Sequence, residues 1–82
     1  MKLNEKINYY RKQAKLSQEE LAALVGVSRQ AVSKWELGDA TPELDKLVAL
    51  ARTFGVTTDE LLSEEDPQQP SQESQQPEAD AA

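Results

Sequence analysis

The sequence predicts an all-α domain of five short helices, and three observations lead to this prediction. Apolar residues recur every three or four positions from Leu3 to Leu62, as they do along one face of a helix. Two of these runs follow a Ser or Thr that has Glu three residues later, and three runs end at a glycine. No stretch carries the alternating pattern of a half-buried strand.

The first two helices are predicted from spacing and from one capping signal. The first spans about residues 3–14, where the apolar stripe consists of Leu3, Ile7, Tyr10 and Ala14. The second follows Ser17, which forms a capping-box pattern with Glu20. Gly26 ends it, because glycine can adopt the left-handed conformation of a sharp turn. The apolar positions of this second helix are Leu21, Ala22, Leu24 and Val25.

A third helix follows this tight turn, over about residues 28–37. Ser28 is placed to cap it and Gly38 to end it. Helical spacing directs three apolar residues inward: Ala31, Val32 and Trp35. The outward face is therefore polar and rich in hydrogen-bond donors, and it carries Arg29, Gln30, Ser33 and Lys34.

The two remaining helices are expected to complete the core. Thr41 and Pro42 predict the cap and first residue of the fourth helix, and Gly55 predicts its end. Thr57 and Glu60 repeat the capping-box spacing, which predicts a last helix over residues 58–62. The buried positions of these two helices are expected to be Leu44, Leu47, Val48, Ala51, Phe54, Leu61 and Leu62.

Composition excludes several classes of function. The chain has no Cys and no His, which removes disulfides, thiolate or imidazole metal sites and the usual pairs of nucleophile and base. We therefore expect no catalysis, no metal and no cofactor. No apolar run approaches the length of a membrane span, and the polar N-terminus lacks the apolar segment of a signal peptide. These features favour a cytoplasmic protein without membrane contact.

The charge of the chain is unevenly distributed. The net charge of −6 belongs to residues 63–82, because residues 1–62 contain nine basic and nine acidic residues. Within that neutral part, residues 1–36 carry a net charge of +3 and residues 37–62 a net charge of −3. The basic half includes the first three predicted helices, and positive charge there is the polarity that contact with phosphate requires.

The segment LSQEELAALVGVSRQAVSKWELG, residues 16–38, is a helix-turn-helix pattern. It resembles the XRE family of bacterial and phage regulators, the Cro and phage-repressor type of DNA-binding domain. The resemblance rests on the stretches 16–22, 26–30 and 33–36 with Gly38, and it continues through Pro42, Leu47 and 59–62. It covers about residues 3–62 and implies a lambda-repressor-like fold and a sequence-specific double-stranded DNA-binding transcriptional regulator.

In a helix-turn-helix, the second helix of the pair enters the major groove, so its outer residues reach base edges. The expected base contacts are therefore Arg29, Gln30, Ser33 and Lys34. Phosphates are expected near the start of the preceding helix and along the basic half, at Gln18, Ser17, Ser28, Lys12 and Lys15. The resemblance further implies a partly buried ion pair between Arg11 and Glu36.

Two domain-level expectations complete the prediction. Residues 1–62 form the DNA-binding domain, which we expect to bind a near-palindrome as two copies. Residues 63–82 form a disordered acidic tail rich in Gln, Pro and Ser, either a linker toward a further domain beyond residue 82 or an autoinhibitory segment. The alternative function is a protein-interaction module, such as an antitoxin, that uses the same fold on a protein partner.

Overall fold

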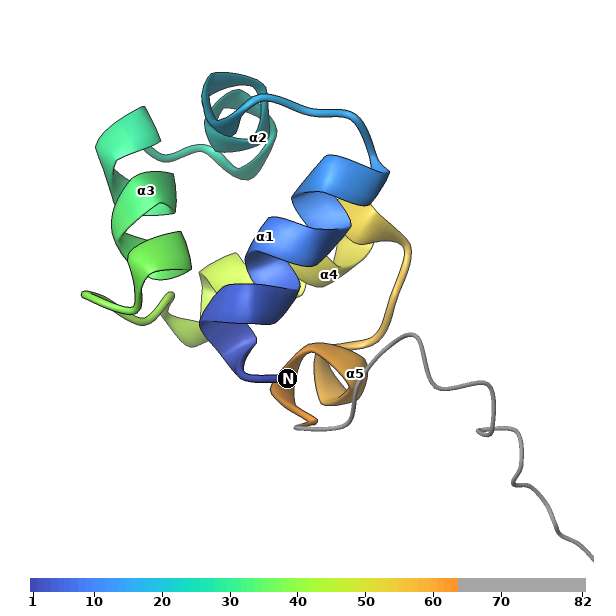
Figure 1. Ribbon diagram of the computed structural model, residues 1–82. Coiled ribbons are helices and arrows are strands. Elements are labelled where there is room, and N and C mark those ends of the chain that lie inside the picture. Colours follow the sequence, from blue (N-terminus) through green and yellow to red (C-terminus); the bar gives the residue numbers. More distant parts are fainter. Residues whose placement is uncertain (64–82) are drawn as a thin grey trace, which may run out of the picture.

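The computed structural model describes residues 1–63, which form five α-helices (Figure 1). They are α1 (Leu3–Gln13), α2 (Gln18–Val25), α3 (Arg29–Leu37), α4 (Leu44–Phe54) and α5 (Thr58–Leu62). Residues 1–63 contain no strand, so the prediction of an all-α fold is confirmed. Apart from Ser63, the predicted acidic tail lies outside the described residues.

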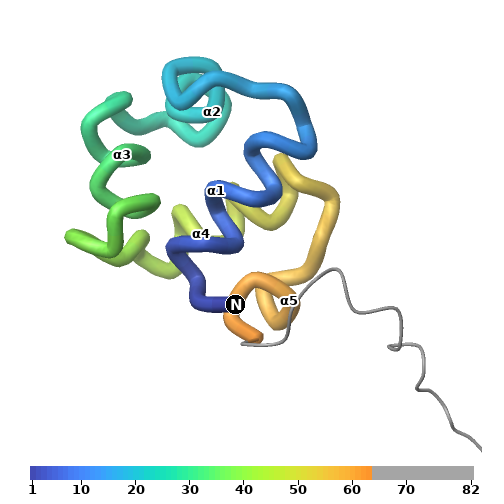
Figure 2. The backbone as a smooth tube through the Cα atoms, in the orientation of Figure 1, coloured from blue at the N-terminus to red at the C-terminus, as the bar shows by residue number. Residues whose placement is uncertain are grey.

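The helices are arranged around α1. The backbone trace shows α1 in the middle of the fold, with α2 and α3 toward one end and α5 at the other (Figure 2). α1 contacts α3, α4 and α5, while α2 packs against α3 and α4. None of the described helices is long and apolar enough to cross a membrane.

Each of the five helices contributes one completely buried aliphatic side chain to the core. These residues are Ile7, Leu21, Val32, Leu50 and Leu61, and each has no exposed surface. Burying a side chain of this size contributes about 1.5–3 kcal/mol. The core is completed by smaller side chains and by the indole of Trp35, which is only 6% exposed. Trp35 is therefore a core residue, as its spacing predicts.

The predicted helix ends are mostly confirmed. The hydroxyls of Ser17, Ser28 and Thr57 each accept a backbone N–H from the first turn of the helix that follows. Gly26 ends α2 with φ of +86°, a left-handed conformation that a side chain would strain. The same conformation ends α3 and α4, at Gly38 and Gly55.

Three leucines that were predicted to lie in the core are exposed instead. Leu24 is 61% exposed. The other buried residues of α2, Ala22 and Val25, lie on one side of Leu21 around the helix axis, and Leu24 lies on the opposite side. Leu44 is 71% exposed and Leu62 is 53% exposed. They are the first residue of α4 and the last residue of α5, where the helix has few neighbours to cover a side chain. Periodicity alone does not distinguish such terminal positions from buried ones.

The predicted start of the fourth helix is wrong. α4 begins at Leu44, its N-cap is Glu43, and the Glu43 side chain makes no capping hydrogen bond. Pro42 is buried before the helix begins, so packing of its ring overrides the local preference of Thr–Pro for a helix start. At α5 the Thr57 cap is present, but its hydrogen bond from the Glu60 amide is not reciprocated by the Glu60 carboxylate.

The Glu60 carboxylate instead joins α5 to α1. It accepts a hydrogen bond from the Tyr10 hydroxyl at 2.8 Å and lies 3.6 Å from the ammonium nitrogen of Lys6, which also donates to the Glu60 carbonyl. The Lys6 side chain is completely buried. Burial of the Tyr10 hydroxyl and its hydrogen bond to Glu60 raise the pKa of Tyr10. Because a helix of five residues is unstable alone, these contacts and Leu61 hold α5 in place.

Candidate nucleic-acid interface

The α3 helix presents its polar side chains away from the core. Val32 and Trp35 are buried and Ala31 packs against the core, so the opposite side of α3 faces outward. The expected base-reading side chains Arg29, Gln30 and Lys34 are exposed, and Ser33 is half-buried. Arg29 and Gln30 are the first two residues of the helix. In a helix that enters the major groove by its N-terminus, these positions are the first to reach base edges.

The start of α2 offers backbone donors. Ser17 and Glu20 form the predicted capping box: the Ser17 hydroxyl accepts the Glu20 N–H at 2.9 Å, and the Glu20 carboxylate accepts the Ser17 N–H at 2.8 Å. The amides of Gln18 and Glu19 belong to the first turn and have no partner within the helix. The helix dipole is positive at this end, which favours an anion.

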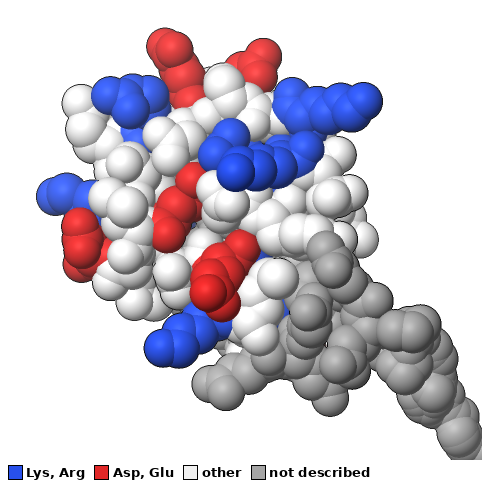
Figure 3. Space-filling view, viewed as in Figure 1, with Lys and Arg blue, Asp and Glu red and all other residues white. Residues whose placement is uncertain are grey.

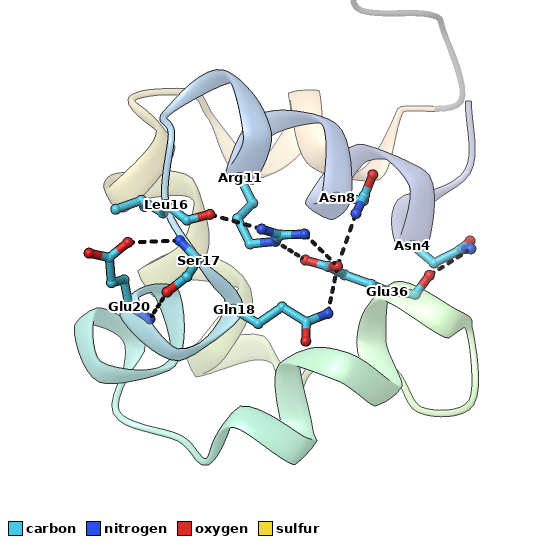
Figure 4. A network of polar contacts seen from close by, with 8 residues as sticks. All are labelled: Asn4, Asn8, Arg11, Leu16, Ser17, Gln18, Glu20 and Glu36. Carbon is cyan, nitrogen blue, oxygen red and sulfur yellow. Dashed lines mark hydrogen bonds and ion pairs between the residues drawn. The ribbon is translucent and has the colours of Figure 1, made fainter.

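The Gln18 side chain is half-buried and faces Glu36 of α3. Its amide nitrogen donates a hydrogen bond to Glu36 Oε1 at 3.0 Å (Figure 4). One of its two N–H donors is therefore occupied within the protein. The second N–H remains for the phosphate contact that is expected at this residue.

Glu36 is the centre of a network that joins three helices (Figure 4). Arg11 Nε donates to Glu36 Oε2 at 2.6 Å, and Arg11 Nη2 donates to Oε1 at 3.2 Å. Asn8 also donates to Oε1, at 3.0 Å, and a third donor of Arg11 binds the carbonyl of Leu16 before α2. The network thus connects α1 with the α1–α2 turn, with α2 through Gln18, and with α3.

The ion pair that the resemblance implies is nearly dry. The Arg11 side chain is 13% exposed and the Glu36 side chain is 6% exposed. Burial raises the pKa of the Glu36 carboxyl, but the hydrogen bonds from Arg11, Gln18 and Asn8, together with the charge of Arg11, outweigh it and lower the pKa below its ordinary value. Glu36 is therefore ionised at neutral pH and acts as an acceptor only.

The contact of Asn8 with Glu36 was not predicted from the sequence. A signal was present, because Asn4, Asn8 and Arg11 follow one another at steps of four and three and form a polar stripe on α1. Asn4 donates to the carbonyl of Glu36 at 3.4 Å. Three polar side chains on one helix face therefore meet the C-terminal end of α3.

Lys12 and Lys15, expected near phosphates, are exposed. The hydroxyls of Ser17 and Ser28, also expected there, accept hydrogen bonds from the backbone at the starts of α2 and α3. Lys15 adopts a left-handed conformation with φ of +61° in the turn between α1 and α2. Within residues 1–63, no three carboxylates lie together in an arrangement that would hold a metal ion.

Basic side chains are dispersed over this part of the molecule. Lys and Arg lie around the face formed by α1, α2 and α3, with Asp and Glu between them (Figure 3). Two of the seven basic residues in positions 1–36 point inward, because Lys6 is buried and Arg11 is paired with Glu36. The exposed positive charge is carried by Lys2, Lys12, Lys15, Arg29 and Lys34.

Comparison with known proteins agrees with this geometry. The helix-turn-helix family model matches residues 7–61. The chain belongs to the helix-turn-helix family. Among helix-turn-helix relatives, the HTH-type transcriptional activator BcrR of Enterococcus faecalis is 46% identical over 66 residues, which are 80% of this chain and 32% of that protein. The chain thus spans about a third of the length of BcrR.

A short regulator and the chain of a solved repressor–DNA complex each match over nearly their whole length. The regulator MJ0272 of Methanocaldococcus jannaschii is 38% identical over 64 residues, which are 78% of this chain and 97% of that protein. The P22 c2 repressor in complex with a synthetic operator superimposes with a TM-score of 0.75 at 34% identity, over 79% of this chain and 98% of the repressor chain. The lambda-repressor-like fold is therefore confirmed.

Proposed function

We propose that this chain is a sequence-specific double-stranded DNA-binding transcriptional regulator that inserts α3 into the major groove. The observation that carries the proposal is the polar outer face of α3, in a helix pair that matches the P22 c2 repressor in complex with a synthetic operator. In this proposal residues 1–62 are the DNA-binding domain, the chain catalyses no reaction, and it acts on cytoplasmic DNA in a bacterium or phage-infected cell.

Base recognition is assigned to four side chains. Arg29 can pair bidentately with guanine O6 and N7, and Gln30 can do so with adenine N6 and N7. Each such pair discriminates by about 1–3 kcal/mol against the wrong base. Ser33 and Lys34 lie one turn further along α3 and extend the same outward face. Gln18, Ser17, Ser28, Lys12 and Lys15 are assigned to the phosphates that flank these bases.

Two copies of the chain are proposed to bind a near-palindromic operator. The half-sites would lie about one helical turn, roughly 34 Å, apart, because each copy presents one α3 to one face of the duplex. The exposed positive charge is small, so the sequence-independent part of the affinity should be weak at physiological salt. Specific base contacts must then supply a large share of the binding free energy.

The proposal is tested by titrating labelled protein with a mixed-sequence duplex at low salt and following the backbone amide resonances. We expect shifts concentrated at Gln18 and in residues 28–34, and we expect them to fade as salt is added. The next step would be selection of an operator from a random pool. An absence of shifts in these residues would refute the DNA assignment and favour the alternative of a protein partner.

A further inference from the structure

The half-buried Gln18 side chain is held before any DNA arrives. Its nitrogen donates to Glu36 Oε1 at 3.0 Å, and Glu36 is itself fixed by Arg11, with its Nε only 2.6 Å from Oε2. An ionised carboxylate only accepts hydrogen bonds, so the amide of Gln18 must direct its nitrogen, and not its oxygen, toward Glu36. The Gln18 side chain therefore has a defined orientation at the start of α2.

This orientation bears on phosphate binding. A phosphate oxygen accepts hydrogen bonds, so only the nitrogen side of the Gln18 amide can bind it. Gln is among the side chains that lose most rotamer freedom when they are immobilised. A Gln18 already fixed by Glu36 does not lose that freedom on binding DNA, which raises affinity without any new contact.

We propose that Glu36 is a positioning residue for DNA binding that orients Gln18 so that its remaining N–H serves a backbone phosphate. This inference rests on the proposed function. It separates two roles of the Glu36 network: the contacts with Arg11 and Asn8 connect α1 to α3, whereas the contact with Gln18 prepares the DNA-facing end of α2.

Electrostatics alone predicts the opposite effect of removing the Glu36 charge. Glu36→Gln adds one positive unit to the net charge of the domain, and long-range attraction to phosphate should then tighten DNA binding. The positioning role predicts weaker binding. The amide that Glu36→Gln introduces can both donate and accept hydrogen bonds, so it no longer requires Gln18 to turn its nitrogen toward position 36. The sign of the change therefore distinguishes the two explanations.

The test is a double-mutant cycle with Glu36→Gln and Gln18→Met, read as the affinity for a fluorescent mixed-sequence duplex at low salt. We expect each single variant to weaken binding by about fivefold, the effect of losing one ordinary hydrogen bond. In the Gln18→Met background, Glu36→Gln should cause no further loss. Independent effects that multiply, or a Glu36→Gln variant that binds more tightly, would overturn the proposal.

Asn8→Ala is the matched control. It removes the other amide hydrogen bond on the same oxygen of Glu36, at the same distance of 3.0 Å, but from α1. We expect the affinity of the Asn8→Ala variant for the duplex to stay within about twofold of the wild type. The contact of Asn8 with Glu36 joins α1 to α3 and does not orient Gln18, so its loss should lower only the stability of the fold. A loss as large as that of Glu36→Gln would assign the whole network to the fold and refute the positioning role.

The wild-type protein supplies a second measurement should Glu36→Gln unfold. The side-chain amide of Gln18 in the free protein should be as rigid as the backbone on the picosecond to nanosecond scale. A freely rotating Gln18 amide would refute the proposal. If the wild-type protein shows no salt-dependent binding to the duplex, the proposed function itself fails. If the wild-type protein binds but the effects of Glu36→Gln and Gln18→Met are independent, only the positioning role of Glu36 is overturned.

Discussion

The Arg11–Glu36 ion pair offers the strongest test of how this small fold is held together. Arg11→Met leaves the Glu36 carboxylate, 6% exposed, without its countercharge. Removing one partner of a buried pair costs about 3–5 kcal/mol, because the remaining charge stays desolvated. A domain of this size has roughly 3–9 kcal/mol of stability in total. The single variant should therefore lose about a third or more of its free energy of unfolding.

Glu36→Leu and the double variant complete the cycle. In the double variant no charge is stranded, so it should be more stable than the sum of the two single losses implies, with a coupling of about 2 kcal/mol or more. Urea unfolding followed by Trp35 fluorescence measures all four proteins, since Trp35 is buried and becomes exposed on unfolding. Losses that add within about 0.5 kcal/mol would refute the energetic pairing of Arg11 with Glu36.

The pKa of Glu36 in the folded protein lies below its ordinary value of 4.5. The ionised carboxylate should therefore stabilise the fold fully above pH 4.5, and this contribution should be lost as the pH falls through the lower pKa of the folded protein. Urea unfolding of the wild type and of Glu36→Gln should accordingly give free energies of unfolding that converge in acid. Lys15→Gly should raise the free energy of unfolding by about 0.5–1 kcal/mol, because glycine adopts the left-handed conformation at this position without strain. Gly26→Ala should lower the free energy of unfolding by about 1 kcal/mol, because it places a side chain on a left-handed residue. Changes of the opposite sign, measured by urea unfolding, would contradict the assigned backbone strain. Deleting residues 64–82, with six carboxylates, should tighten binding to mixed-sequence DNA several-fold at low salt, and an unchanged affinity would exclude competition by this segment.

Local signals predicted most of the fold because they act within a few residues. A capping hydroxyl and a left-handed glycine satisfy backbone groups next to them, so Ser17, Ser28 and Gly26 have the same role in the sequence as in the structure. The start of α4 was mispredicted because Pro42 is buried before the helix begins, and the Thr–Pro pattern does not show this. Leu24 and Leu44 were mispredicted because periodicity shows which residues share a face but not how far a neighbouring helix covers it.

The outward face of α3 and the Arg11–Glu36 pair could be predicted, but the rest of the network around Glu36 could not. On a helix, the residues that face inward determine which residues face outward, so the buried positions of Val32 and Trp35 define the outward face of α3. The contact between Gln18 and Glu36 joins residues 18 positions apart, and no local pattern indicates it. The burial of Lys6 against α5 was also unexpected, because a lysine on a predicted amphipathic helix is ordinarily solvated.

The division of α3 into two sides has a consequence for how such a chain can diversify. Its anchoring side consists of Ala31, Val32, Trp35 and Glu36, whereas the exposed Arg29, Gln30 and Lys34 lie off the buried core. Substitutions at the exposed positions should cost little stability, because surface changes away from special features usually stay within about ±0.5 kcal/mol. In the proposed binding mode, a duplicated gene would therefore acquire a new target sequence through a few such substitutions while the folding scaffold stays unchanged.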